Sequence, residues 1–249
     1  MPKTFLAVGA HMDDAELGAG GVLIQAARAG HRVVIVTVVS DYSTWENTIG
    51  REKQVKQDLI ALAKRYGFEK RFLDYPYHQI DGGDLELKKK LAEIYVELKP
   101  DAAFIHHHED HFPDHVACSR ASKDAFLFSH GLTKDRTIQR CPLILSYTVT
   151  SAQTYRFEPG TFYDVTPVMA DFMELIVGTD CCLSGKKPDE IAKYSFSVKG
   201  EKGDDRTFRL GEHGRTKLAD CINHGYITGS LFAQGFVTAW GQRRGPTLF

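Results

Sequence analysis

Residues 4–16 read TFLAVGAHMDDAE, an apolar run that ends in a cluster of His and Asp side chains. The apolar part, Thr4–Val8, is predicted to be a strand, and Leu17–Ala29, which Gly30 follows, is predicted to be a helix. Arg32–Val39 reads RVVIVTVV, a continuous apolar run typical of a strand covered on both faces of a parallel sheet. A strand, a helix and a second buried strand in this order predict an α/β fold.

The alternation of strands and helices continues to about residue 150. We predict further helices and strands at Arg51–Tyr66, Arg71–Leu73, Leu85–Leu98, Ala102–Ile105, Asp114–Phe128 and Leu143–Thr148. This pattern predicts a Rossmann-like, doubly wound, mostly parallel sheet flanked by helices. The sequence contains no evident linker or repeat, so we predict a single domain over residues 1–249. Its core is expected at residues 1–150, and residues 151–249 are expected to form a C-terminal elaboration around the site.

The pattern is less regular beyond residue 150. Phe162–Val165 is predicted to be an edge strand, Pro167–Val177 a helix, and Lys217–Ile222 part of another helix. Lys199–Arg209 is charged and contains glycine, so we expect a surface loop or a mobile flap there.

Composition excludes several classes of protein. The 249 residues include 31 Lys and Arg against 32 Asp and Glu, a formal net charge of −1. This balance argues against a nucleic acid or an anionic membrane surface as partner. The five cysteines are odd in number and form no CxxC, which favours a reducing compartment, and no apolar run reaches the roughly 20 residues of a membrane span. We therefore expect a cytoplasmic protein without a membrane span.

Two predicted strand ends carry side chains that commonly bind metals. Residues 9–16 follow the first strand, and His106–His115, which reads HHHEDHFPDH, follows a later one. Imidazole nitrogen and carboxylate oxygen are ligands that Zn²⁺ accepts, and a catalytic site needs three, which leaves a position for water. His11 and Asp14 can converge from one loop, and His115 can add a third ligand from the other strand end.

Asp13 would then be a spare carboxylate beside a water on the metal. A carboxylate in that position can accept the proton of the water and later pass it to a departing amine. The residues therefore predict a hydrolase for amides. Two His and one carboxylate also form the ligand set of non-haem Fe(II) oxygenases, which is the alternative enzyme class.

Two motifs carry a resemblance to a known family. Ala10–Glu16, AHMDDAE, resembles the AHPDDAE signature of the LmbE-like, or PIG-L, deacetylases, and Pro113–Ala117, PDHVA, is similar to their second motif, HPDHxA. The resemblance implies a Rossmann-like fold and removal of an N-acetyl or similar acyl group from an amino sugar or its conjugate. It also implies one Zn²⁺ per chain, with Fe²⁺ as the alternative ion, and a homo-oligomer, either a trimer or a hexamer.

The resemblance assigns roles to single residues. It makes His11, Asp14 and His115 the metal ligands and Asp13 the general base. Asp114 would be a carboxylate that orients a histidine.

One departure from the family pattern concerns catalysis. Phe112 stands where the family has a histidine that stabilises the transition state, three residues before the last ligand. We expect that role to pass to His111 or His108, with His111 preferred. If the change at Phe112 abolished catalysis, the chain would instead be a metal-dependent sugar-binding module.

Further residues are candidates for substrate binding. The resemblance implies that Arg51 binds substrate hydroxyl or anionic groups. His78 follows a strand and could line the mouth of the site, as could His213. Aromatic side chains on loops after strands could stack on a sugar or simply pack within their loops; these are Tyr42, Trp45, Tyr75 and Tyr77.

Overall fold

The computed structural model describes residues 1–135 and 143–241, and its centre is a seven-stranded sheet. Five parallel strands form most of the sheet: β1 (Thr4–Gly9), β2 (Arg32–Asp41), β3 (Phe68–Pro76), β4 (Ala102–His106) and β5 (Leu143–Tyr147). The full strand order is β3-β2-β1-β4-β5-β9-β6, in which β9 (Ala233–Gly241) runs antiparallel to both of its neighbours. The predicted fold class, a single α/β domain with a mostly parallel sheet flanked by helices, is confirmed.

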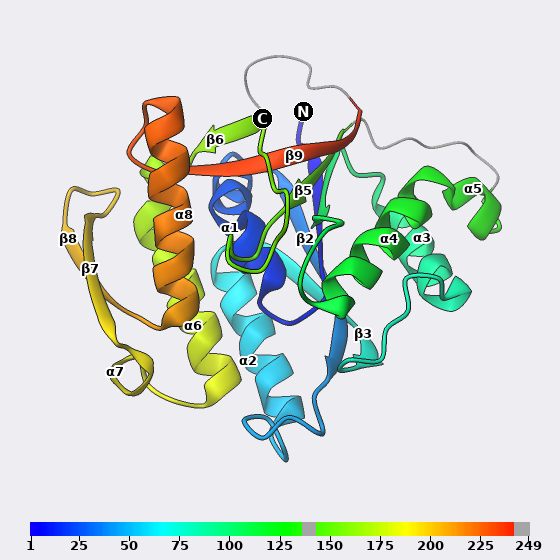
Figure 1. The fold of residues 1–249 in the computed structure, drawn as a ribbon, viewed down its shortest axis with the longest axis horizontal. Helices are drawn as coiled ribbons and strands as arrows, with labels where there is room; N and C mark the ends of the chain where they lie inside the picture. The colour runs from blue at the N-terminus through cyan, green and yellow to red at the C-terminus, as the bar shows by residue number, and fades with distance from the viewer. Residues whose placement is uncertain (136–142, 242–249) are drawn as a thin grey trace.

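Helices cover both faces of the sheet (Figure 1). On one face α6 (Met169–Ser184) contacts both α1 (Asp14–Arg28) and α2 (Glu52–Arg65), and α3 (Leu85–Leu98), α4 (Pro113–Leu127) and α5 (Ser129–Leu132) form the layer on the other. The alternation of side chains along β1 supplies both layers. Phe5 and Ala7 pack into the core on the α1 side, and Leu6 and Val8 pack into the core on the α3 side. Burial on both faces explains why the central residues of β1 and β2 are almost all apolar.

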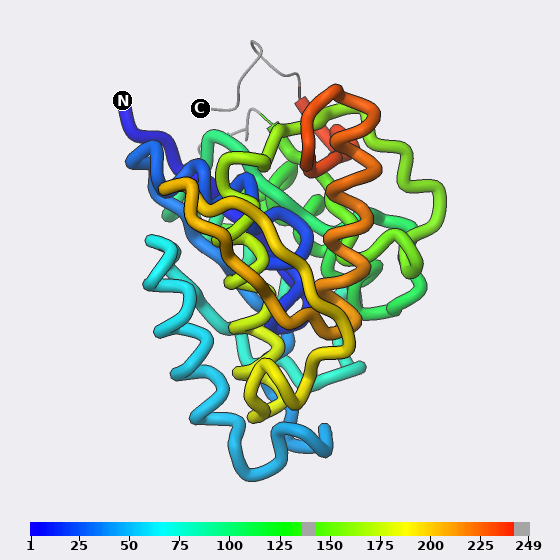
Figure 2. The backbone as a smooth tube through the Cα atoms, turned by 90° about the vertical axis from the view of Figure 1, so that its left-hand side faces the viewer, coloured from blue at the N-terminus to red at the C-terminus, as the bar shows by residue number. Residues whose placement is uncertain are grey.

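The C-terminal part of the chain adds two strands to this sheet and a separate hairpin. The edge strand β6 (Thr161–Asp164) pairs with β9, and a short 3₁₀ helix (Thr166–Val168) leads into α6. The strands β7 (Tyr194–Lys199) and β8 (Asp205–Leu210) form the hairpin, which contacts α6 and α8 (Glu212–Thr228) and follows the short helix α7 (Pro188–Ile191). Figure 2 shows this hairpin as an outer layer of the molecule, on the side of α6 and α8.

Several elements differ from the sequence-based predictions. The expectation of a loop or flap at 199–209 was wrong, because most of these residues pair in β7 and β8. Strand β3 is longer than the predicted Arg71–Leu73, since charged Glu69 and Lys70 lie within it. Helix α1 begins at Asp14 and not at Leu17, because the Leu17 N–H already donates to the Asp13 carbonyl oxygen at 2.9 Å. Strand β9 was not predicted.

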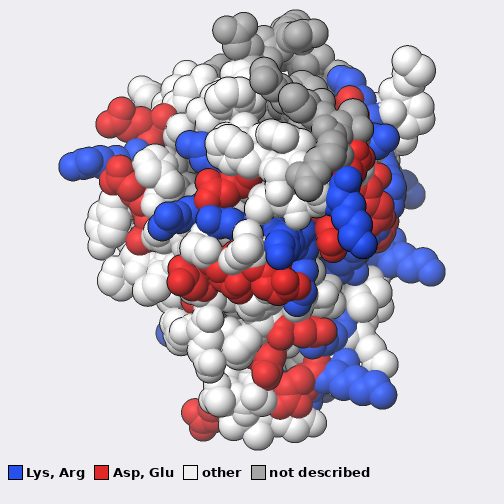
Figure 3. All heavy atoms as spheres, turned by 90° about the vertical axis from the view of Figure 1, so that its right-hand side faces the viewer, with Lys and Arg blue, Asp and Glu red and all other residues white. Residues whose placement is uncertain are grey.

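The surface agrees with the balanced charge. Figure 3 shows Lys and Arg side chains interspersed with Asp and Glu on the face that carries α3, α4 and α5. Among the described residues, no helix has the length and apolar character needed to cross a membrane.

Candidate metal centre and active-site cavity

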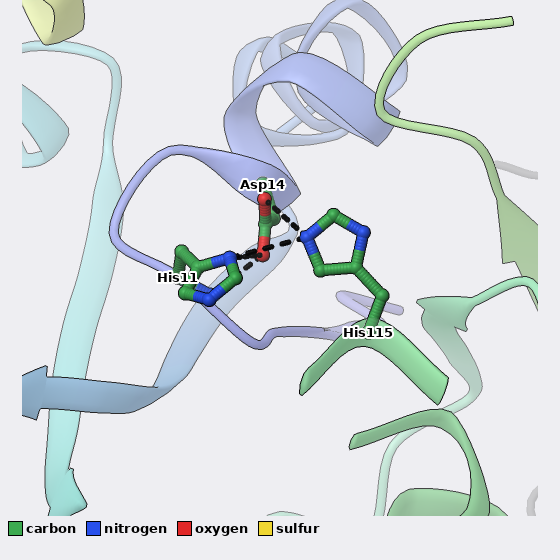
Figure 4. A group of neighbouring side chains, drawn as sticks. All are labelled: His11, Asp14 and His115. Atoms are coloured by element: carbon green, nitrogen blue, oxygen red, sulfur yellow. Dashed lines mark hydrogen bonds and ion pairs between the residues drawn. The ribbon is translucent and has the colours of Figure 1, made fainter. Parts of the chain in front are cut away.

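Three side chains from the two predicted motifs converge at the carboxyl edge of the sheet (Figure 4). One donor atom from each of His11, Asp14 and His115 lies within 4.8 Å of the other two. His11 Nδ1 is 3.1 Å from His115 Nε2, and each of these nitrogens is 3.4 Å from an Asp14 carboxylate oxygen. All three residues are buried.

The sheet topology explains why residues so far apart in sequence meet. Strand β4 lies beside β1 in the sheet, so the segments that leave their carboxyl ends run side by side. His11 lies in the loop after β1, and His115 lies in the first turn of α4, after β4. Gly9 allows the tight turn at the end of β1, because a Cβ there would lie 3.1 Å from the His11 carbonyl oxygen and 3.2 Å from the Ala15 nitrogen.

A carboxylate contacts the outward-facing nitrogen of each histidine. Asp114 Oδ2 is 3.0 Å from His11 Nε2, and Asp110 Oδ1 is 3.0 Å from His115 Nδ1. Carboxylates in this position fix the ring orientation of metal-binding histidines and raise their basicity. The sequence predicted this role for Asp114 but not for Asp110. The position of Asp110 directly before the HFPDH segment could have indicated it.

His106, the last residue of β4, lies against Asp14. Its Nε2 accepts a hydrogen bond from the Ala10 N–H at 2.9 Å and lies 3.1 Å from Asp14 Oδ2. Burial lowers the pKa of His106 to about 4, so the imidazole is neutral at physiological pH. Asp14 also accepts a hydrogen bond from the His11 N–H at 2.6 Å. Although burial opposes ionisation of Asp14, the neighbouring His115 and His11 hold its pKa well below the usual range.

The charges of the donor set suit a cation. Burial lowers the pKa of His11, but Asp14 and Asp114 outweigh it and raise the value to about 9. His115 behaves in the same way, since burial is outweighed by Asp14 and Asp110 and its pKa is raised to about 10. A divalent ion can replace the protons that the carboxylates favour on these rings. The two imidazoles and one carboxylate therefore fit Zn²⁺ by ligand type and number.

The donor atoms open into a cavity of about 380 Å³. Asp13 lines it next to His11 and Asp14. Although Asp13 is the residue before α1, its side chain makes no hydrogen bond that caps the helix, so the carboxylate is available to the cavity. Burial and the nearby Asp14 raise the pKa of Asp13, against the opposing effect of His213.

Aromatic side chains form one wall of the cavity. The rings of Tyr42 and Tyr77 stack with centroids 5.1 Å apart. The Trp45 ring lies 5.6 Å from that of Tyr42, and the His11 ring lies 5.2 Å from that of Tyr77. Phe112 also lines the cavity, and its ring stacks on His115 at 5.1 Å. Flat apolar surfaces of this kind can pack on the face of a sugar ring.

The C-terminal region supplies the opposite side of the cavity. His213 at the start of α8 and Asp180 in α6 both line it, and His213 Nδ1 is 3.2 Å from Asp180 Oδ1 and 3.9 Å from Asp13 Oδ2. The sequence predicted a place for His213 at the mouth of the site and gave no sign of Asp180. No local pattern joins these residues to Asp13, because helix packing brings them together.

Three other predicted residues lie apart from the donor atoms. His111 is exposed, its Nδ1 is 3.3 Å from the Tyr155 hydroxyl, and it lines a separate depression with Asp81 and Arg120. Arg51 donates to the carbonyl oxygens of Asn47 and Cys182.

His78 contacts the centre through its backbone. Its N–H donates to Asp114 Oδ2 at 3.0 Å, and its ring lies beside Tyr77. The roles of His111, Arg51 and His78 therefore stay predictions.

The fold and the donor set define a class of protein, in which a His–Asp–His group lies at the carboxyl edge of a Rossmann-like sheet. Residues 6–126 match the sequence model of the family described as PIG-L, GlcNAc-PI de-N-acetylase. The predicted resemblance to the LmbE-like, or PIG-L, family is thus confirmed over this segment. The matched segment contains most of β1, all of α1 and most of α4, and hence all three donor residues.

Individual relatives agree with this family. The chain is 28% identical over 165 residues, 66% of its length and 82% of the relative's, to "Uncharacterized deacetylase YaiS" of Escherichia coli (strain K12). The structure is similar to N,N'-diacetylchitobiose deacetylase from Pyrococcus horikoshii with a TM-score of 0.72 and 19% identity, over 95% of this chain and 83% of that one. Together, the family match and YaiS support the predicted class of deacetylase.

The same fold also serves another reaction. The structure is similar to GalB, the 4-carboxy-2-hydroxymuconate hydratase of Pseudomonas putida KT2440, with a TM-score of 0.72 and 17% identity over 98% of this chain and 99% of that one. The fold alone therefore does not decide the reaction, and the argument for function depends on the side chains of the site.

Proposed function

We propose that the protein is a zinc-dependent hydrolase that removes an N-acetyl or similar acyl group from an amino sugar or its conjugate. The observation that carries this proposal is the convergence of His11, Asp14 and His115 beside the uncommitted carboxylate of Asp13. The family match and the similarity to YaiS, which is named an uncharacterized deacetylase, favour an amide hydrolase over an oxygenase that uses the same ligand types. Fe²⁺ remains the alternative ion, and a trimer or hexamer remains a prediction.

His11, Asp14 and His115 would hold the ion, and Asp110 and Asp114 would keep the two rings in place. Zinc bound there would supply Lewis-acid activation of water and of the amide carbonyl. Asp13 lines the cavity next to this position, and its raised pKa makes the carboxylate a better proton acceptor than an exposed aspartate. It would take a proton from water as the water oxygen attacks the carbonyl carbon.

The aromatic wall supports a sugar as the substrate. Tyr42, Trp45 and Tyr77 present apolar ring surface beside the donor atoms, and the cavity also has polar side chains such as Gln153 and Ser184 to bind hydroxyl groups. This mixture of aromatic faces and hydrogen-bonding groups suits a neutral carbohydrate. Diacetylchitobiose, the substrate named for the Pyrococcus horikoshii deacetylase, is therefore a rational first compound to test.

The test is release of free amine from N-acetylglucosamine, its glycosides and diacetylchitobiose by the zinc-loaded protein. We expect Asp13→Asn to lower kcat by about 100-fold or more while zinc content, measured by mass spectrometry of the metal, is unchanged. Full activity of this variant would refute the role of Asp13. Oxygen uptake by the Fe²⁺-loaded protein without amine release would instead identify an oxygenase.

A further inference from the structure

Amide hydrolysis requires two proton transfers, and Asp13 accounts for only one of them. One proton leaves the attacking water, and another must reach the nitrogen when the C–N bond breaks, because an unprotonated amide nitrogen is a poor leaving group. Two histidines that line the cavity, His11 and His115, contribute donor atoms to the proposed metal centre. The other histidine in the lining is His213.

His213 is held in one orientation by a carboxylate from another helix. Its Nδ1 is 3.2 Å from Asp180 Oδ1, which joins the first turn of α8 to α6. Because Nδ1 is directed at Asp180, the other ring nitrogen, Nε2, is left for a ligand. The side chain is 46% exposed, so a substrate in the cavity can reach it.

The charges around His213 favour its protonated form. The hydrogen bond to Asp180 is the largest effect, burial opposes it, and Asp13 and Asp14 add to it, which together raises the pKa of His213 to about 9. Glu212, on the same helix, also lines the cavity, but its charge is paired with Arg215. The imidazole thus carries a proton at physiological pH and can give it away.

We propose that His213, oriented by Asp180, is the catalytic acid that protonates the departing amine. This inference rests on the proposed amide hydrolysis. Asp13 takes a proton from water as the water oxygen bonds to the carbonyl carbon. The C–N bond then breaks, its electron pair stays on nitrogen, and Nε2–H of His213 gives its proton to that nitrogen.

The products are a carboxylic acid and a free amine. Asp13 then releases its proton to solvent, and His213 takes a proton from solvent, so both side chains return to their starting states. His213 Nδ1 is 3.9 Å from Asp13 Oδ2, so the imidazole ring of the proposed acid lies beside the carboxylate of the proposed base.

This assignment differs from the expectation drawn from the sequence. Phe112 cannot exchange a proton, and His111, the residue expected to replace it, lines a different depression. His213 and Asp180 both lie outside residues 6–126, the segment that the family model matches. The acid is therefore a feature of this chain's C-terminal region.

The first experiment compares two substrates with different leaving groups. In His213→Gln we expect kcat for an N-acetylated amino sugar to fall about 100-fold, with KM, zinc content and circular dichroism unchanged. For 4-nitrophenyl acetate, whose phenolate leaves without prior protonation, we expect kcat to stay within about three-fold of wild type. His130→Gln, in α5 and outside the residues that line the cavity, is the matched control and should leave both rates unchanged.

The second experiment uses the metal-free protein and Asp180→Asn. The NMR signal of the His213 ring should titrate near pH 9 in the wild type, as its raised pKa of about 9 predicts, and at a lower pH in Asp180→Asn, because the carboxylate that favours the proton is lost. An acid loses activity as the pH rises through its pKa. The alkaline limb of kcat for the zinc enzyme should therefore move to lower pH in the same variant.

The outcomes separate the two proposals. If wild-type protein releases no amine from any substrate while the NMR titration behaves as expected, the proposed amide hydrolysis fails. If wild type is active and His213→Gln keeps its amide kcat, the assignment of His213 is wrong. If His213→Gln lost kcat equally for the amide and for 4-nitrophenyl acetate, His213 would serve only to hold α8 against α6. That result would also overturn the assignment.

Discussion

The two sides of the cavity are built in different ways. On the metal side, His11, Asp14 and His115 are 8%, 2% and 3% exposed, and carboxylates hold both rings. On the opposite side, the His213 side chain is 46% exposed. Asp180 holds its ring, with Oδ1 3.2 Å from His213 Nδ1. The metal side is thus preorganised by the parallel sheet, whereas the other side depends on how α6 and α8 dock.

The largest expected effect tests whether the metal side acts as a unit. His115→Ala removes one of three donors and leaves Asp110 without its imidazole partner. We expect loss of bound zinc and a fall in amide hydrolysis of about 1,000-fold or more, because the Lewis acid is lost with the ligand. Metal analysis and the amine-release assay measure this, and His130→Ala, in α5, is the control at a histidine outside the centre. Retention of stoichiometric zinc by His115→Ala would show that the ion binds elsewhere.

A buried ion pair beneath the metal side gives the next largest effect. Lys70 Nζ lies 2.5 Å from Glu16 Oε1 and donates to the Met12 carbonyl oxygen at 2.8 Å, and the two side chains are 0% and 3% exposed. Lys70→Met leaves the Glu16 charge buried and unpaired, which should cost about 3–5 kcal/mol in the free energy of unfolding. Urea denaturation of the metal-free protein measures this cost.

The matched control for Lys70→Met comes from the C-terminal region. Lys199 and Asp205 pair across the β7–β8 hairpin with side chains 67% and 76% exposed, so Lys199→Met should cost less than about 1 kcal/mol. Equal losses in the two variants would contradict the view that the metal side is the more tightly constrained region.

The sequence predicted the metal side better for a physical reason. Strands β1 and β2 are buried on both faces, so their apolar runs are visible without knowledge of the fold, and the position of ligands after such strands follows from the topology. The hairpin strands are mostly exposed, and their residues between 194 and 210 lack the apolar runs that marked β1 and β2. His213 meets Asp13 only through helix docking, which no local pattern encodes.

Asp110 tests how far the carboxylates contribute to the metal side. Asp110→Asn keeps the size of the side chain but removes the charge 3.0 Å from His115 Nδ1, so the ring is held less firmly and becomes less basic. We expect zinc affinity, measured by competition with a chelator, to fall about 10- to 100-fold. Glu109→Gln, one residue away, should leave the affinity unchanged. An unchanged affinity in Asp110→Asn would mean that His115 is positioned by the helix alone.

The smallest expected effect concerns how the hairpin is attached to the cavity's other side. Arg206 in β8 donates to Asp171 Oδ1 at 2.9 Å and also pairs with Glu174, and both acids lie in α6, the helix that carries Asp180. The Arg206 side chain is 27% exposed, so the pairs are partly screened by solvent. Arg206→Gln should therefore weaken the attachment by no more than about 1 kcal/mol, which would speed amide hydrogen exchange in β7 and β8 by about five-fold or less. Exchange in β1 and zinc content should not change, because neither depends on this contact. If exchange in β1 rose as well, the hairpin and the sheet would open together, and the two sides of the cavity would be one cooperative unit.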